Sequence, residues 1–149
     1  MSELWYFAYG SNMNPERMEL RRAFFSRRIH GVLDGWSLAF DTVRSDGSAA
    51  ANIHPSPGCR VEGALYLVPP SSLDALDRFE GVPHHYVRTE VIVRTASEGL
   101  VPAIAYVATE ASLREGIFPT KEYLSHLLRG EDLLSPEYFN TLKAQRTAD

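Results

Sequence analysis

An almost unbroken run of apolar and aromatic residues at positions 4–9 predicts a first strand that is buried on both faces. The run stops at Gly10 and passes through small polar residues before a helix begins. Asn14 is a preferred N-cap, Pro15 suits the first helical position, and Glu16 complements the helix dipole. We expect this helix to end near position 22.

Short apolar segments that predict strands dominate the middle of the chain. Residues 29–40 carry a turn or bend at positions 34–35, and positions 42–48 predict a loop. A short strand at 50–53 meets two prolines and a glycine at 54–58, which predict a turn that ends it. Further strands are expected at 61–68, 86–94 and 101–107, the last two paired around a turn at 97–99.

Three more helices complete the pattern. Ser71, with Asp74 three residues later, resembles a capping box, and Thr120 and Ser135 begin two helices near the end. This order lacks the regular strand–helix alternation of a doubly wound sheet. The sequence therefore predicts an α+β fold with a mixed, curved, β-barrel-like sheet and flanking helices, in a single domain over residues 1–149.

Composition and charge exclude several function classes. The formal net charge of −4 and a pI near 5.7 argue against a nucleic-acid partner, which usually requires a net basic surface. The single cysteine, with neither a leader-like segment nor a bilayer-spanning apolar run, favours a cytoplasmic protein without a membrane partner. Five arginines cluster early in the chain, and we expect a solvated helix-and-loop face there: Arg17, Arg21, Arg22, Arg27 and Arg28.

Glu80 is an acid in an unusual place. Helical spacing puts it on the same face as Leu73 and Leu76, and it lies just before Gly81 at the expected end of the helix. An apolar surrounding and the C-terminal end of the helix dipole both raise a carboxylate pKa. A raised pKa suits a general base that works near neutrality. The alternative is a frayed helix end that leaves Glu80 in solvent.

The connection at Gly10, Ser11 and Asn12 is the second candidate. A sharp strand-to-helix turn gathers backbone N–H groups around a small concavity, which favours a carboxylate or a developing oxyanion. The turn matches neither the dinucleotide-binding glycine pattern nor the phosphate loop. An ordinary capped connection is the alternative. Together with Glu80, the turn suggests an enzyme that acts on a small molecule.

Other chemistries have little support in the sequence. His84 and His85 are adjacent, so they point in opposite directions in an extended chain and cannot easily share a metal ion. No spacing typical of a metal site is present, and Ser11 has no identifiable histidine or acid partner for a catalytic triad. We therefore expect no bound metal.

Several segments resemble the γ-glutamylcyclotransferase-like (AIG2-like) family. The opening YFAYGSN at 6–12 and LDALDRFEG at 73–81 are the most specific. VEGALY at 61–66, the strand at 86–93 and the tyrosine-bearing segment at 119–124 continue the similarity, which covers roughly residues 5–145 and is weakest at 41–48.

The resemblance implies a mixed β-barrel and conversion of a γ-glutamyl compound to 5-oxoproline plus a free amine, with no cofactor. It implies that Glu80 is the catalytic base and that the loop N–H groups hold the substrate, with Tyr123 lining the pocket and Tyr86 nearby. The expected substrate-binding residues are Tyr6, Phe7, Ala8, Tyr9, Gly10, Ser11, Asn12, Tyr86 and Tyr123.

Two other function classes stay open: a non-catalytic ligand-binding or regulatory module of the same fold, and a protein-interaction domain without a pocket. An acid at position 80 favours the enzyme, because a binder of an anionic ligand gains nothing from a nearby carboxylate. The leaving amine could belong to glutathione, a γ-glutamyl amino acid or a γ-glutamyl amine. That choice depends on the loops around 44–48 and 84–85, where the sequence shows no readable pattern. Oligomeric state is equally open.

Overall fold

The computed structural model describes residues 2–149. The first strand, the last two strands and the two late helices begin within a residue of their predicted positions. In chain order the elements are β1 (Leu4–Ala8), the 3₁₀ helix η1 (Ser11–Met13), α1 (Pro15–Leu20), β2 (Arg27–Val43), β3 (Ala49–Val68), α2 (Pro70–Glu80), β4 (Tyr86–Arg94), β5 (Leu100–Ala108), η2 (Glu110–Ser112), α3 (Lys121–Leu128) and α4 (Pro136–Lys143).

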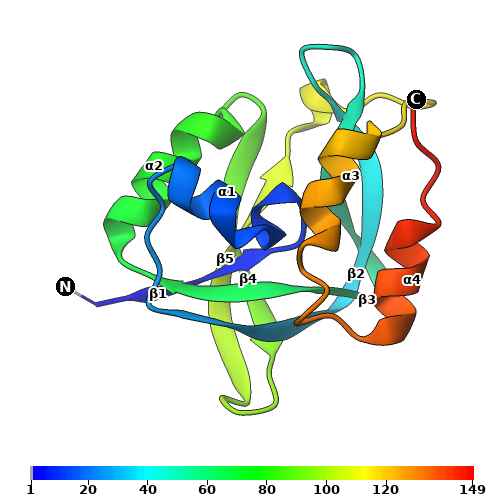
Figure 1. Ribbon diagram of the computed structural model, residues 1–149. Helices are drawn as coiled ribbons and strands as arrows, with labels where there is room; N and C mark the ends of the chain where they lie inside the picture. The colour runs from blue at the N-terminus through cyan, green and yellow to red at the C-terminus, as the bar shows by residue number, and fades with distance from the viewer. Residues whose placement is uncertain (1) are drawn as a thin grey trace.

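The strands close into a barrel in the order β1-β3-β2-β4-β5 (Figure 1). Antiparallel ladders join every neighbouring pair except β1 and β5, which close the ring in parallel through Tyr6 and Ile104. The predicted α+β fold with a mixed, barrel-like sheet and flanking helices is confirmed. Because β1 is held on both sides, the loop that leaves it at Gly10 starts from a rigid base.

The long β2–β3 hairpin corrects two predictions. Residues 54–58 do not end a strand but lie inside β3. The register between the two strands shifts at Asp34/Trp36, so the extra residues of β3 bulge outward, where exposure makes the missing proline N–H groups tolerable. The other correction concerns β2, which extends through Thr42 and Val43 into the expected loop.

At Gly63, β3 lies so close to β1 that the barrel interior has no room for a side chain. Phe7 is fully buried, and a Cβ atom at Gly63 would lie 3.0 Å from its ring and 2.4 Å from the carbonyl oxygen of Ala8. Only glycine allows β1 and β3 to pack this closely. Phe7 and Ala8 therefore belong to the packed barrel wall.

The helix starts follow the predicted caps with one exception. The side chains of Asn14, Thr120 and Ser135 accept hydrogen bonds from backbone N–H groups in the first turns of α1, α3 and α4. The predicted cap Ser71 lies inside α2 instead, because the helix begins at Pro70, whose fixed φ suits a first helical position.

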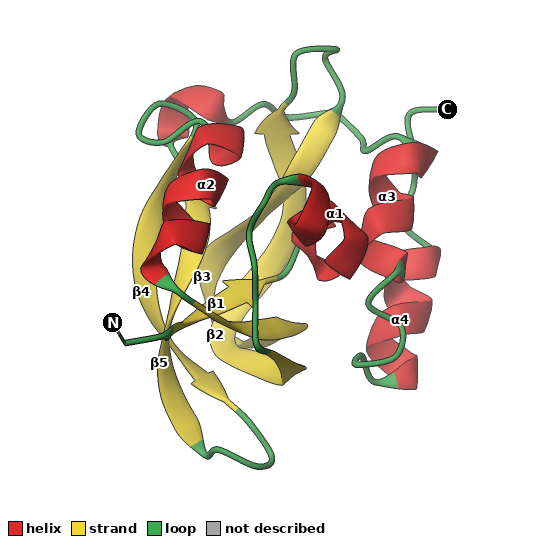
Figure 2. Ribbon diagram, turned by 60° about the vertical axis from the view of Figure 1, so that its left-hand side comes forward, coloured by secondary structure: helices red, strands yellow, loops and turns green. Residues whose placement is uncertain are grey.

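The helices lie on the outside of the barrel. In Figures 1 and 2, α1 lies between α2 and α3, and α4 packs beyond α3. None of the helices in residues 2–149 combines the length and apolar character that crossing a bilayer would need.

Candidate active site

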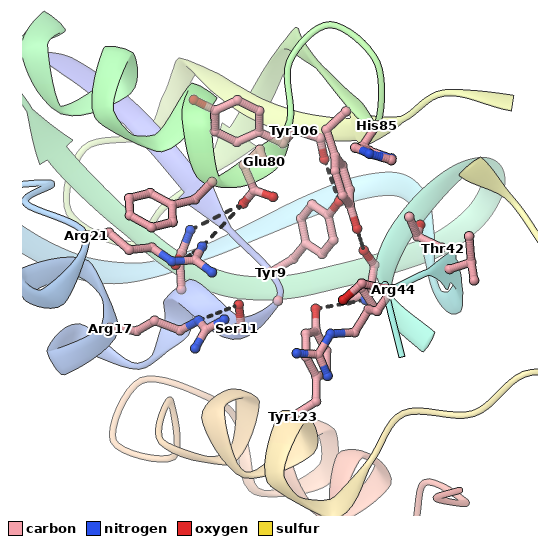
Figure 3. Close-up of a pocket in the computed structure, with 18 of the residues that line it drawn as sticks. Tyr9, Ser11, Arg17, Arg21, Thr42, Arg44, Glu80, His85, Tyr106 and Tyr123 are labelled. Atoms are coloured by element: carbon pink, nitrogen blue, oxygen red, sulfur yellow. Dashed lines mark hydrogen bonds and ion pairs between the residues drawn. The ribbon is translucent and has the colours of Figure 1, made fainter. Parts of the chain in front are cut away.

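A cavity of about 500 Å³ lies where the Gly10 loop, α1 and the ends of α2 and β2 meet α3. Figure 3 shows Glu80, Arg17 and Arg21 on one side of it, and Thr42 and Arg44 on the other. Segments far apart in the chain thus contribute polar side chains to one space. The cavity is large enough for a dipeptide-sized ligand.

Glu80 stands at the last position of α2, as its spacing predicts. Leu73 and Leu76 on the same helix are fully buried, whereas the Glu80 side chain keeps 17% of its surface exposed. Gly81 ends the helix in the left-handed region with φ of 65°, and a Cβ there would approach the His85 ring within 2.6 Å. The glycine therefore fixes the helix end, and with it the position of Glu80, at the cavity wall.

The Glu80 carboxylate has few partners for a group so well enclosed. Asn12 donates to Oε1 at 3.5 Å, and the Arg21 guanidinium lies 4.0 Å away. Burial raises the pKa of Glu80 above the ordinary value, and the charges of Arg21 and Arg17 offset only part of that effect. A carboxylate in this state accepts a proton more readily than one in water.

Hydrogen bonds with tyrosines of β1 and β3 hold the Gly10 loop in place. Asn12 donates to the hydroxyl of Tyr6 at 2.9 Å, and its carbonyl accepts from Tyr66 at 2.6 Å. The loop's own backbone hydrogen bonds are donated by Met13 and Asn14. Within the described part of the chain, the N–H groups of residues 10–12 donate to no protein acceptor, and all three residues line the cavity.

Two arginines correct the prediction of a solvated basic face. Arg17 and Arg21, one helical turn apart, both border the cavity. Arg17 donates to the Ser11 hydroxyl at 3.1 Å, and Arg21 donates to the Asn12 side chain at 3.2 Å. Their position one turn apart, directly after the loop, was the signal available in the sequence.

Tyrosines form the remaining wall. Tyr86 donates to the Ala51 carbonyl at 2.8 Å, and the Ala51 N–H donates to the Tyr123 hydroxyl at 2.9 Å. Burial raises the pKa of Tyr9, Tyr86 and Tyr123, so all three hydroxyls remain protonated near neutrality. Gly10 lies beside Tyr123, since a Cβ at that glycine would sit 3.4 Å from its hydroxyl.

The structure gathers most of the predicted site residues around Glu80 and leaves two outside. Phe7 and Ala8, which border no part of this cavity, are buried in the barrel wall. Their strand contributes Tyr6 to the cavity, and the chain reaches the cavity again at Tyr9, while the two residues between them stay buried in the wall. The predicted residues that do line the cavity are Tyr6, Tyr9, Gly10, Ser11, Asn12, Tyr86 and Tyr123.

Sequence reasoning missed Thr42, Phe79 and Tyr106, which also border the cavity. Arg44 and His85 border it too, and they come from the loops around 44–48 and 84–85 on which the choice of leaving amine was expected to depend. Thr42 belongs to a stretch with no motif, so only the path of β2 reveals it. No cluster of three or more histidines, cysteines or acids in residues 2–149 is placed to hold a metal ion.

Comparison with known proteins gives a consistent result. The family model "Gamma-glutamyl cyclotransferase, AIG2-like" matches residues 6–125. The chain is 35% identical to human gamma-glutamylcyclotransferase over 147 residues, which cover 93% of this chain and 77% of that protein. A crystal structure of the human protein loc79017 is similar with a TM-score of 0.89 and 30% identity, over 100% of this chain and 91% of that one. A solved gamma-glutamyl cyclotransferase is similar with a TM-score of 0.85 and 31% identity, over 99% and 90% of the two chains.

Proposed function

This chain belongs to the γ-glutamyl cyclotransferase, AIG2-like family, and we propose that it converts a γ-glutamyl amino acid or γ-glutamyl amine into 5-oxoproline and a free amine. The family resemblance carried by residues 6–12 and 73–81 is confirmed. The observation that best supports this chemistry is the carboxylate of Glu80, because nearby positive charges offset only part of the rise in its pKa that burial causes. It lies in the same cavity as residues 10–12, whose N–H groups donate to no protein acceptor.

The proposed reaction takes place within one substrate molecule. The α-nitrogen of the glutamyl moiety attacks its own γ-carbonyl carbon, a new C–N bond closes the five-membered lactam, and the original amide C–N bond breaks. The α-nitrogen loses two protons, and the leaving nitrogen gains two. Glu80 accepts protons from the first and returns them to the second. Because nucleophile and electrophile share one molecule, the reaction needs no cofactor.

The surroundings of Glu80 ease the first proton transfer. An ordinary glutamic acid, with a pKa of about 4.3, would take a proton from an α-ammonium of about 7.7–8.0 at a cost of roughly 5 kcal/mol. Each unit by which burial raises the pKa of Glu80 removes about 1.4 kcal/mol of that cost. The direction of the shift therefore favours its role as a base.

Positioning supplies the other contribution. A flexible glutamyl chain must fold so that its amine meets its own carbonyl, and fixing such a geometry can contribute about 7–11 kcal/mol. The N–H groups of residues 10–12, together with Arg17 and Arg21, offer anchors for the α-carboxylate or the oxyanion. Tyr86 and Tyr123 would shape the opposite wall of the cavity.

Replacement of Glu80 by glutamine tests this proposal. Glu80→Gln keeps the shape of the side chain and removes the base, so we expect 5-oxoproline release to fall by about 10²–10⁴-fold. Circular dichroism should show an intact fold. The matched control is Glu16→Gln, because Glu16 is an exposed acid paired with Arg129 away from the cavity, and that variant should keep full activity.

Two results would contradict the proposal. Wild-type turnover by Glu80→Gln would remove Glu80 from the chemistry. Wild-type protein that is stabilised against heat by γ-glutamyl compounds but releases no 5-oxoproline would instead identify a non-catalytic binding module of the same fold.

A further inference from the structure

The cavity has a wall that the proposed reaction does not use. The guanidinium of Arg44 lies over the Tyr123 ring, with its central carbon 5.0 Å from the ring centroid, and it forms no ion pair with any residue in 2–149. Asp46, the acid of the same turn, is engaged by the N–H and hydroxyl of Ser48. Arg44 is therefore held at the cavity without a direct ion pair, although its charge helps to lower the pKa of Asp46.

Thr42 is a buried residue of the same wall. Its hydroxyl oxygen has no accessible surface, and its interaction with the Tyr86 hydroxyl lowers the pKa of that tyrosine against the larger effect of burial. A ligand atom cannot reach an oxygen that is covered in this way, so Thr42 supports the wall, while the partly exposed Arg44 is the charged group that a ligand can contact. Figure 3 shows Thr42 and Arg44 on the same side, across the cavity from Glu80.

The geometry of a γ-glutamyl donor decides which part of it reaches this wall. Its α-ammonium and α-carboxylate sit on one carbon, so both must bind at one end of the cavity. Glu80, the loop N–H groups and Arg17 provide a proton acceptor and anion partners together at that end. The leaving amine, on the far side of the γ-amide, then points toward Thr42 and Arg44.

The charges around the cavity favour a second anionic group. Three arginines border it, and Glu80 is the one acid among its lining residues in the described chain. Burial lowers the pKa of Arg17, and the positive charges of Arg21 and Arg44 lower it further. One donor carboxylate between them relieves only part of this repulsion.

We propose that Arg44 binds a carboxylate carried by the leaving amine. Arg44 is then a specificity-determining residue that selects γ-glutamyl-α-amino acids over γ-glutamyl amines without an acidic group. This inference rests on the proposed function, because that function sets the orientation of the donor.

Two donors that differ in a single carboxylate test the inference: γ-glutamyl-alanine and γ-glutamyl-ethylamide. Wild-type protein should show a kcat/KM about 10- to 100-fold higher for γ-glutamyl-alanine, the range expected for a hydrogen bond to a charged group. Arg44→Met should lose most of this preference by losing activity on γ-glutamyl-alanine, with far less change on the ethylamide. Arg44→Lys should restore part of it.

A matched control is Arg146→Met. The Arg146 guanidinium also stacks on an aromatic ring, 4.3 Å from the centroid of Phe118, but it lies outside this cavity. Its removal should leave the preference between the two donors unchanged. Equal losses on both donors in Arg44→Met would overturn the inference, since Arg44 would then hold the glutamyl carboxylate or merely support Tyr123.

Binding measurements separate this inference from the proposed function. In a Glu80→Gln background, calorimetry should show tighter binding of γ-glutamyl-alanine than of the ethylamide, and the addition of Arg44→Met should abolish the difference. If wild-type protein releases no 5-oxoproline while this Arg44-dependent difference persists, the reaction fails and the carboxylate site stands. Equal binding of both compounds in the presence of Arg44 would overturn the carboxylate site, whatever the turnover.

Discussion

Two enclosed carboxylates, Glu62 on β3 and Glu80 at the end of α2, have opposite chemical states. Glu62 is 3% exposed and accepts hydrogen bonds from the Ser135 N–H at 2.8 Å and the Ser135 hydroxyl at 2.6 Å. His30 lies 3.0 Å from the same carboxylate. Burial alone would raise the pKa of Glu62, but these hydrogen bonds outweigh burial, and the pKa lies below the ordinary value.

Glu80 lacks such compensation. Its nearest polar partner is a single amide at 3.5 Å, so burial dominates and the pKa lies above the ordinary value. The comparison shows that burial alone does not determine the pKa of an acid. The number of hydrogen-bond donors directed at the carboxylate decides whether its pKa is raised or lowered. Glu62 joins β3 to the start of α4, while Glu80 has no comparable set of hydrogen-bond donors.

The largest effect on stability is expected at Glu62. Glu62→Gln removes the charge that Ser135 and His30 compensate, and we expect a loss of about 1–3 kcal/mol in the free energy of unfolding. Urea denaturation measures this loss, with Glu16→Gln as the exposed control. An unchanged midpoint would mean that the Ser135 contacts contribute nothing to the folded state.

A smaller effect of opposite sign is expected at Glu80. The folded protein holds Glu80 at a raised pKa, so its ionisation costs stability above the ordinary pKa of about 4.3. Glu80→Gln should therefore raise the unfolding free energy at pH 7, and the gain should shrink toward pH 4. A lower free energy of unfolding for Glu80→Gln at pH 7 would contradict the raised pKa of Glu80.

The same pH series gives a contrasting result for Glu62. A lowered pKa contributes stability that is present above the ordinary value and is lost as the pH falls through the folded value. The deficit of Glu62→Gln should thus be greatest near neutrality and fade in acid. Parallel pH curves for the wild type and this variant would show that Glu62 is not stabilised as an anion.

The smallest expected effect is a shift in the pH dependence of kcat/KM. The Arg21 charge lowers the pKa of Glu80 and partly offsets burial. Arg21→Gln should therefore raise the pKa of Glu80 and move the acidic limb of kcat/KM toward higher pH. Arg129→Gln, which alters a surface pair with Glu16, serves as the control. If the acidic limb of kcat/KM does not move in Arg21→Gln, a group other than Glu80 determines it.

Local patterns predicted a large part of the fold and one end of the candidate site. The caps at Asn14, Thr120 and Ser135, the helix face that carries Glu80, and the turn at Gly10 all depend on residues within a few positions of one another. The turn predicted at 54–58 was wrong because pairing with β2 carries β3 through the prolines as a bulge. In that case, ladder contacts outweighed local preference.

The sequence by itself determined the family, the order of the elements and the placement of an acid on an apolar helix face, because periodicity and capping act over a few neighbouring residues. Only the tertiary structure decided that the Glu62 carboxylate has hydrogen-bond donors that Glu80 lacks, and that Arg44 stacks on the Tyr123 ring. These contacts join segments that are distant in the chain. Closure of the barrel brings such segments together, and no local pattern encodes the resulting distances.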